Sequence, residues 1–246
     1  MKGVLPKVWE GFLDLLYPEG IYCYLCGEKI RTHHTYGICE GCWGEFVFIG
    51  DKSCSVCGKY LHSGDLCSDC RSFRHSFDRA YSLCVYDGKV KDWIYSFKYA
   101  GRSYLARPFG RMMADGIREA GLDRKTDCIV PVPLYRKKFR QRGYNQSGLL
   151  AETIKRELDI KASSYILQRK SNTPPLSGLS RLQRLETMEG AFEVKGVRRL
   201  AVKNVLLIDD IYTTGSTVNQ CARALKNGGA SRVYVFTLAS GKDRQG

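Results

Sequence analysis

The sequence predicts an α/β fold, in which a parallel sheet is flanked by helices and preceded by a small cysteine-rich module. Two patterns support this fold. Through residues 78–246, short aliphatic runs alternate with segments of helical spacing, as in parallel sheets that are covered on both faces. Within residues 1–77, cysteines recur in close pairs separated by polar residues. We therefore expect two domains, residues 1–77 and residues 78–246.

The composition is typical of a globular protein with one good core and a small extra module. The chain has 246 residues, of which 43% are hydrophobic and 26% are charged. No apolar run reaches transmembrane length, and charges interrupt the first 18 residues, so the sequence predicts neither a membrane span nor a signal peptide. A cytoplasmic location is the resulting expectation.

Positive charge is concentrated in the predicted α/β domain. The net charge of the whole chain is +14. Residues 1–77 hold 8 basic and 9 acidic residues, whereas residues 78–246 hold 31 basic and 16 acidic residues. A surplus of this kind favours a polyphosphate ligand, a nucleic acid, or both, although solvated basic faces are also common.

Eight of the eleven cysteines form four C-x-x-C pairs. Two pairs supply the four thiolates of a tetrahedral zinc site, so the spacing predicts two structural zinc ions. Sequential pairing gives two ribbons, residues 23–42 and 54–70, and a crossed arrangement is the alternative. Disulfides are disfavoured in a reducing cytosol. The predicted ligands are Cys23, Cys26, Cys39, Cys42, Cys54, Cys57, Cys67 and Cys70.

The remaining cysteines and three nearby histidines are not expected to bind metal, because eight thiolates already suffice for two sites. The cysteines lie in apolar contexts and are predicted to be buried thiols, and the histidines are predicted to lie at the surface. These residues are Cys84, Cys128 and Cys221, and His33, His34 and His62. Ahead of the first pair, residues 4–16 place their apolar side chains on one helical face.

Strands and helices alternate through the middle of the chain. The predicted strands are residues 80–86 and 127–132, and the predicted helices are residues 90–99, 105–120 and 145–158. A strongly basic segment follows the second strand and is predicted to be a loop at the edge of the sheet. Such a loop would hold phosphate or pyrophosphate; a solvated loop and a nucleic-acid patch are the alternatives. Its basic residues are Arg136, Lys137, Lys138, Arg140 and Arg142.

Residues 168–189 are polar and rich in arginine, serine and proline, without apolar periodicity. A segment of this length and composition is expected to form a flap that excludes water from a site, with an ordinary surface loop as the alternative.

The most informative segment is residues 205–217. An aliphatic strand at residues 205–208 ends in Asp209 and Asp210, and a small hydroxyl-rich turn leads into a helix at residues 218–226 and a strand at residues 232–238. Such a turn lies where open α/β sheets bind ligands and where free backbone N–H groups attract anions. The turn residues are Thr213, Thr214, Gly215, Ser216 and Thr217.

These residue types suit a ribose 5-phosphate. The hydroxyls of the turn and its free N–H groups can donate to phosphate oxygens, and Gly215 allows a close approach of the backbone. Asp209 and Asp210 would repel phosphate, so they are predicted to accept hydrogen bonds from a vicinal diol. The alternative is an ordinary junction in which Ser and Thr only cap the helix. A carboxylate pair beside an anion site favours the ligand-binding interpretation.

At these residues the chain resembles the phosphoribosyl-pyrophosphate motif of type I phosphoribosyltransferases. Over nearly its whole length it resembles the ComF (ComFC-like) family of competence proteins, in which a cysteine zinc ribbon precedes such a domain. The resemblance is carried by the cysteine pairs and by residues 97–101, 130–133, 142–146, 173–175, 190–192 and 209–217. It implies a role in natural transformation, contact with single-stranded DNA at the inner face of the cytoplasmic membrane, and a ComFA-like helicase as partner.

The resemblance also implies residue roles. Asp209 and Asp210 would bind the ribose hydroxyls directly or through Mg²⁺, residues 213–217 would bind the 5-phosphate, and Lys98 would reach the site. The chain departs from the family pattern at Leu176 and Thr187, which are therefore left out of the site.

Three functions remain open at the level of the sequence. The first is phosphoribosyl transfer with release of pyrophosphate, which depends on positioning and electrostatics because its transition state resembles an oxocarbenium ion. The second is binding without turnover, either as a ribose-phosphate sensor or as a site that holds DNA ends. The third is a zinc-ribbon adaptor that docks the helicase.

Overall fold

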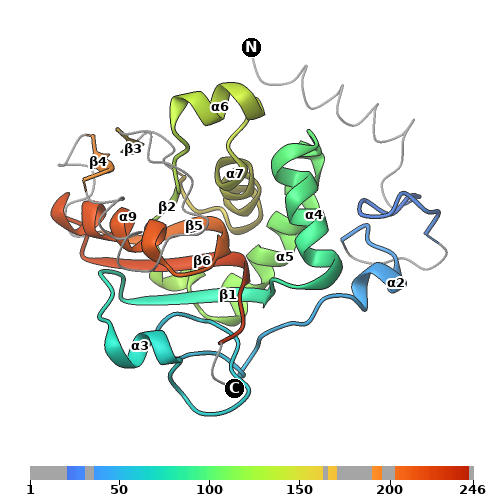
Figure 1. Cartoon of the computed structure of the whole chain (residues 1–246). Helices are drawn as coiled ribbons and strands as arrows, with labels where there is room; N and C mark the ends of the chain where they lie inside the picture. Colours follow the sequence, from blue (N-terminus) through green and yellow to red (C-terminus); the bar gives the residue numbers. More distant parts are fainter. Residues whose placement is uncertain (1–20, 31–35, 163–165, 171–189, 196–202, 244–246) are drawn as a thin grey trace. The chain divides into compact units, whose positions relative to one another are not determined.

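The computed structural model describes residues 21–30, 36–162, 166–170, 190–195 and 203–243 (Figure 1). The contacts divide the chain into two compact units, Met1–Phe46 and Val47–Gly246. The smaller unit holds the first four paired cysteines and the short helix α2 (Glu40–Trp43). The larger unit holds the other four paired cysteines together with the whole α/β part of the chain.

The larger unit is built on a four-stranded sheet in the order β1-β6-β5-β2, and all of its strand pairs are parallel. These strands are β1 (Arg79–Val85), β2 (Cys128–Pro131), β5 (Asn204–Tyr212) and β6 (Arg232–Ser240). The central strands are buried along most of their length, which explains their nearly continuous aliphatic sequence. The predicted α/β fold is confirmed.

Helices pack against this sheet (Figure 1), and so does the second cysteine cluster. The helices α5 (Ala106–Glu119) and α7 (Gln146–Leu158) pack on each other, and α7 contacts β5 and β2. The helix α9 (Ser216–Asn227) contacts β5 and β6. Val205 and Leu207 of β5 share a hydrophobic cluster with residues of α9 and with Cys54, Cys57 and Cys67. The second cysteine cluster is therefore part of the main core.

The remaining elements are short or peripheral. They are α3 (Ser68–Ser72), α4 (Gly88–Tyr99), α6 (Arg136–Arg142), the 3₁₀ helices η1 (Ser103–Leu105) and η2 (Asp123–Lys125), and the antiparallel pair β3 (Leu167–Arg169) and β4 (Phe192–Val194). Among the described residues, no helix combines the length and apolar content that a membrane-spanning helix needs.

Two predictions of secondary structure were wrong. The basic segment is the helix α6 rather than a loop; Lys, Arg and Gln are good helix formers, and Gly143 ends the helix with a φ of 82°. The strand β5 does not end before the acidic pair but continues to Tyr212, because its last residues still pair with Ala239 and Ser240 of β6. The predicted N-terminal helix and most of the predicted flap lie outside the described residues.

Candidate functional site

The turn between β5 and α9 has the form of an anion-binding loop. Gly215 has a φ of 74°, and a Cβ atom there would lie 2.2 Å from the hydroxyl of Tyr212, so only glycine fits. No side chain caps α9; instead the hydroxyls of Thr214 and Ser216 lie 3.1 Å apart. The N–H groups of the first turn are therefore available to a ligand. This geometry disfavours the capping alternative.

A small cavity opens beside this turn. Its volume is about 60 Å³. It is lined by Asp209, Ile211, Tyr212, Thr213, Thr214, Gly215, Ser216, Thr217 and Val218. One of the two predicted carboxylates and all five predicted turn residues thus share one cavity, at the carboxyl end of a central parallel strand.

The two carboxylates have different partners. Asp209 accepts a hydrogen bond of 2.8 Å from the Ser147 hydroxyl at the start of α7 and one of 2.9 Å from the backbone N–H of Asp210. Burial, and then the charge of Asp210, raise the pKa of Asp209 to about 7. Asp210 is 6% exposed and pairs with the Lys98 ammonium at 2.9 Å. Asp210 is therefore buried and ion-paired to α4, whereas Asp209 is half-buried and held by α7.

Four cations lie close to one another, and two of them, Lys98 and Arg169, interact with the carboxylates. Burial alone would lower the pKa of Lys98, but the charge and hydrogen bond of Asp210 raise it. Burial lowers the pKa of Lys138, and the like charges of Arg169, Arg142 and Lys98 lower it further. Burial also lowers the pKa of Arg169. These cations, crowded together by α4, α6 and β3, form a group that an anion would stabilise.

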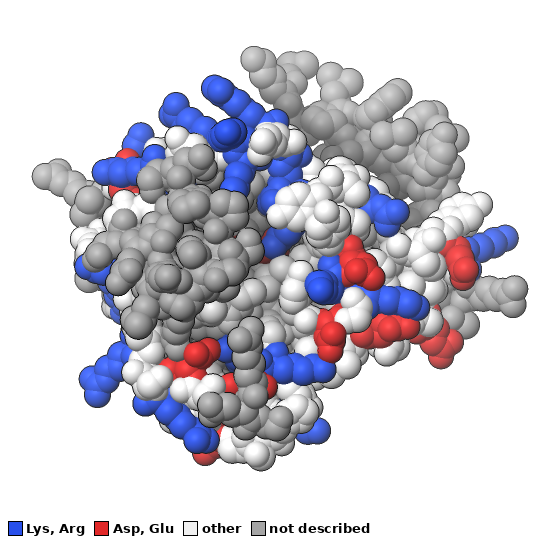
Figure 2. Space-filling view, in the orientation of Figure 1, with Lys and Arg blue, Asp and Glu red and all other residues white. Residues whose placement is uncertain are grey.

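The helix α6 divides the predicted basic residues into two sets. Lys138 and Arg142, one helical turn apart, are half-buried, and Arg142 lies 4.7 Å over the ring of Tyr99. The other set is exposed and, among the described residues, lines an open hollow of about 650 Å³. It consists of Arg136, Lys137 and Arg140, with Tyr135 and Gln141. Figure 2 shows Lys and Arg side chains gathered over α6.

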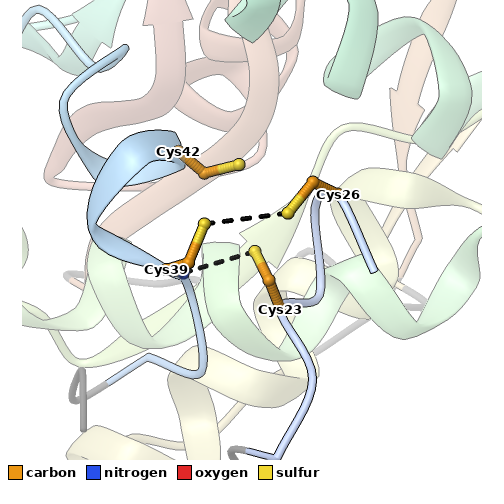
Figure 3. A group of neighbouring side chains, drawn as sticks. All are labelled: Cys23, Cys26, Cys39 and Cys42. Atoms are coloured by element: carbon orange, nitrogen blue, oxygen red, sulfur yellow. Dashed lines mark hydrogen bonds between the residues drawn. The ribbon is translucent and has the colours of Figure 1, made fainter. Parts of the chain in front are cut away.

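The first cysteine cluster consists of Cys23, Cys26, Cys39 and Cys42, whose sulfur atoms all lie within 4.8 Å of one another. The side chains converge from a loop and from α2 (Figure 3). The backbone N–H groups of Leu25 and Cys39 donate to the Cys23 sulfur at 3.4 and 3.3 Å. Four converging thiolates with N–H donors fit a tetrahedral zinc ion.

The second cluster has the same ligand set. Cys54, Cys57, Cys67 and Cys70 converge within 4.8 Å, and the N–H of Cys67 donates to the Cys54 sulfur at 3.4 Å. The structure therefore groups the cysteines in sequential order and not in the crossed arrangement. It also buries Cys84, Cys128 and Cys221 and exposes His62, as predicted, whereas His33 and His34 lie outside the described residues.

Three residues of this region are absent from the predicted site: Ser147, Arg169 and Tyr212. Ser147 lies in a helical segment, and its bond to Asp209 spans 62 positions, so no local pattern indicates it. Arg169 falls in the segment predicted to be a flap, where its basic character points only to a surface residue. Tyr212 follows the acidic pair, where an aromatic residue could have indicated that the strand continues.

Comparisons with known proteins agree with this architecture. A double zinc ribbon domain family matches residues 12–71, and the phosphoribosyl transferase domain family matches residues 145–246. The DNA utilization protein YhgH of Escherichia coli K12 is 30% identical over 222 residues, which cover 88% of this chain and 95% of that protein. Competence protein F of Haemophilus influenzae is 29% identical over 88% of this chain and 96% of its own length. The chain belongs to the ComF family of competence proteins.

Another member, competence protein ComFC of Streptococcus pneumoniae, is 29% identical over 88% of this chain and 98% of its own length. Among solved structures, purine phosphoribosyltransferase from Pyrococcus horikoshii aligns with 56% of this chain and 74% of its own at 18% identity and a TM-score of 0.35, which is too loose to add to the family match. This ComF-family chain thus carries a double zinc ribbon and a phosphoribosyltransferase domain.

Proposed function

We propose that this ComF-family protein binds phosphoribosyl pyrophosphate and transfers its phosphoribosyl group to an acceptor with release of pyrophosphate. The observation that carries the proposal is the uncapped glycine turn of α9, which shares one cavity with the half-buried carboxylate of Asp209. An anion site and a diol acceptor at one cavity suit a ribose 5-phosphate.

Each group has a distinct role in this proposal. The N–H groups and hydroxyls of residues 213–217 bind the 5-phosphate, and Asp209 and Asp210 bind the ribose hydroxyls. The carboxylate oxygens are donors of the kind that Mg²⁺ prefers, and the ion would add positive charge against the pyrophosphate. Lys98 leaves Asp210 or shares it with the ligand.

Release of pyrophosphate requires stabilisation of negative charge on the leaving group. Lys138, Arg142 and Arg169 lie close together: burial lowers the pKa of Lys138, and the charges of the two arginines lower it further. Fixed cations in a half-buried site stabilise developing charge more strongly than cations in water. No acceptor is assigned, and a sensor that binds without turnover uses the same residues.

Contact with single-stranded DNA is a second proposed function, favoured by one face of α4 and α6. Tyr95 and Tyr99 are 61% and 62% exposed, and their rings lie 4.8 Å apart. Arg142 stacks on Tyr99, and the exposed basic residues of α6 follow. Aromatic rings interleaved with cations bind single strands by base stacking and phosphate contacts.

The relatives' names, which refer to competence and DNA utilization, support contact with DNA. Tyr144 is not available to bases, because its hydroxyl donates to the carbonyl of Phe97 at 2.5 Å and its ring packs on that residue. Docking of a ComFA-like helicase remains a proposal from the family resemblance.

The test of the main proposal is calorimetric titration with phosphoribosyl pyrophosphate and Mg²⁺. Asp209→Asn with Asp210→Asn should reduce the affinity by about 100-fold or more while the protein stays folded, since charge-assisted contacts are the strongest ones available. The exposed carboxylate variant Asp51→Asn is the matched control and should bind as the parent does. Parent-like binding by the double variant would reject the assigned site. A screen for pyrophosphate release with bases and single-stranded DNA then separates transfer from sensing.

A further inference from the structure

The second cysteine cluster is connected to the anion-binding turn through a row of aromatic rings. The Cys70 sulfur lies 3.4 Å from Nε2 of His75. The His75 ring stacks on Phe77 with a centroid distance of 4.4 Å, and Phe77 meets Tyr212 edge-on at 6.3 Å. Tyr212 lies against Gly215, since a Cβ atom on Gly215 would be 2.2 Å from its hydroxyl. The row therefore leads from a zinc ligand to the predicted phosphate loop.

A second contact joins the same segment to α9. The backbone N–H of Ser76 donates to the side-chain oxygen of Asn219 at 2.6 Å, and Asn219 is only 6% exposed. The N–H of Asn219 in turn donates to the carbonyl of Gly215 at 2.8 Å. Residues 75–77 thus hold both sides of the turn: the end of β5 through Tyr212 and the first turn of α9 through Asn219.

The part of this connection that adjoins the turn lies in the core. Phe77 and Tyr212 are 4% and 2% exposed and share a hydrophobic cluster with Cys54, Cys57 and Cys67. Rings in contact at these distances transmit a displacement, because a close-packed core leaves little free space. A metal-bound thiolate is an acceptor, so it would also orient His75 through its Nε2–H.

We propose that the second cysteine cluster, when it holds zinc, positions the phosphate-binding turn, and that the first cluster does not. The inference rests on the proposed function only for the identity of the ligand. His75, Phe77 and Asn219 act as positioning residues, since none of them needs to touch the ligand. Loss of zinc from this cluster should loosen residues 213–219 and weaken phosphoribosyl-pyrophosphate binding.

The test uses two matched pairs of variants in the full-length zinc protein. Cys70→Ser is compared with Cys42→Ser, which removes the equivalent ligand of the first cluster. Phe77→Leu is compared with Phe46→Leu. Phe46 is a buried residue of the smaller unit, and its ring centroid lies 6.0 Å from that of Trp43. The phenylalanine pair leaves all eight ligands in place, so it serves even if the serine variants fail to fold.

Three quantities are measured: zinc per chain, calorimetric affinity for phosphoribosyl pyrophosphate with Mg²⁺, and hydrogen exchange of peptides that cover residues 213–219. Both serine variants should lose one zinc ion, but only Cys70→Ser should bind about tenfold more weakly, or roughly 1.4 kcal/mol, and exchange faster in that peptide. Phe77→Leu should keep two zinc ions, but it should also bind more weakly and exchange faster at residues 213–219. Phe46→Leu should behave as the parent.

The exchange measurement separates this inference from the proposed function. If the parent binds no phosphoribosyl pyrophosphate, the proposed function fails, and the exchange of residues 213–219 still reports whether the cluster orders the turn. Unchanged exchange and unchanged affinity in a folded Phe77→Leu variant would overturn the inference, as would equal effects of Phe77→Leu and Phe46→Leu.

Discussion

The two cysteine clusters are nearly identical in their local geometry. In the first knuckle of each cluster, the glycine after the second cysteine has a positive φ, 78° at Gly27 and 68° at Gly58. Its backbone N–H donates a hydrogen bond of 2.9 Å to the carbonyl of the first cysteine. The third cysteine of each cluster precedes a short helix, α2 or α3, with backbone φ and ψ values that agree within 1°. The same ligand spacing therefore produces the same fold around the metal.

The surroundings of the two clusters differ completely. Cys26 is exposed, whereas Cys57 is 0% exposed and lies in the core cluster with residues of β5 and α9. A Cβ atom on Gly27 would meet nothing within 4 Å, whereas one on Gly58 would lie 2.7 Å from the backbone of Ala80 and Tyr81 in β1. The comparison shows that the ligand spacing determines the local backbone geometry around the metal. The contacts of the surrounding residues determine whether the metal stabilises a small module or a whole domain.

The largest expected effect follows from this difference in burial. Cys57→Ser should destabilise the larger unit by about 4 kcal/mol or more, because it removes a buried ligand of a structural metal and leaves polar groups in the core. Cys26→Ser should release zinc from the smaller unit but leave unfolding of the larger unit unchanged. Thermal unfolding followed by the near-ultraviolet signal of the α/β part, with zinc analysis, measures both. Equal destabilisation of the larger unit by the two variants would remove the distinction.

A smaller effect should appear at the knuckle glycines. Gly27→Ala should cost about 1 kcal/mol, the strain of an L-residue at positive φ with free space around it. Gly58→Ala should cost about 3 kcal/mol, because the added methyl group also collides with the backbone of β1. Denaturant unfolding of both variants measures the difference. If the two costs agree, the contact between the second knuckle and β1 is not tight in solution.

Local sequence patterns predicted much of this fold. The aliphatic runs at residues 205–208 and 232–238 lie in β5 and β6, because strands that are buried on both faces leave no other residue types available. The cysteine spacing predicted both clusters for a similar reason, since two knuckles suffice to bring four thiolates together. The helix α6 was missed because a run of cations carries no apolar periodicity.

Contacts between distant parts of the chain could not be predicted in this way. The bond between Ser147 and Asp209, the pairing of Lys98 with Asp210, and the row of rings from His75 to Tyr212 each join elements that are far apart in sequence. The same limit applies to the second cysteine cluster. Its ligands are close together in sequence. The apolar residues near them, Leu61 and Phe77, share a hydrophobic cluster with residues of β5 and α9, which are far away in sequence.

The two regions should also differ in the pH dependence of their stability. Burial raises the pKa of Asp209 in the larger unit from 3.8 to about 7, so between these values the folded state holds a proton that the unfolded state lacks. The contribution of Asp209 to the free energy of unfolding is therefore full below about pH 4 and is lost as the pH rises toward 7. Asp209→Asn should remove this decrease of the free energy of unfolding with pH. It should also raise the stability of the larger unit by roughly 2 kcal/mol at about pH 8.

The measurement is chemical unfolding from about pH 5.5 to about pH 8, a range in which the zinc thiolates stay bound. Asp51→Asn, an exposed carboxylate of the same unit, should keep the slope of the parent. A flat profile in the parent, or a parent-like profile in Asp209→Asn, would show that the carboxyl ionises freely in the folded protein.

The smallest expected effect concerns charge and DNA. Residues 1–77 are nearly neutral, whereas the exposed cations of α6 belong to the basic part of the chain. Lys137→Ala with Arg140→Ala should weaken single-stranded DNA binding several-fold and reduce the salt slope by about 1, because fewer counterions are released. Phosphoribosyl-pyrophosphate affinity should not change, since these side chains line the outer hollow rather than the carboxylate site.

Lys29→Ala with Lys52→Ala removes the same charge from residues 1–77 and should leave DNA binding intact. Fluorescence anisotropy at several salt concentrations compares them, and equal losses in both double variants would mean that net charge alone, and not the face of α4 and α6, attracts the strand.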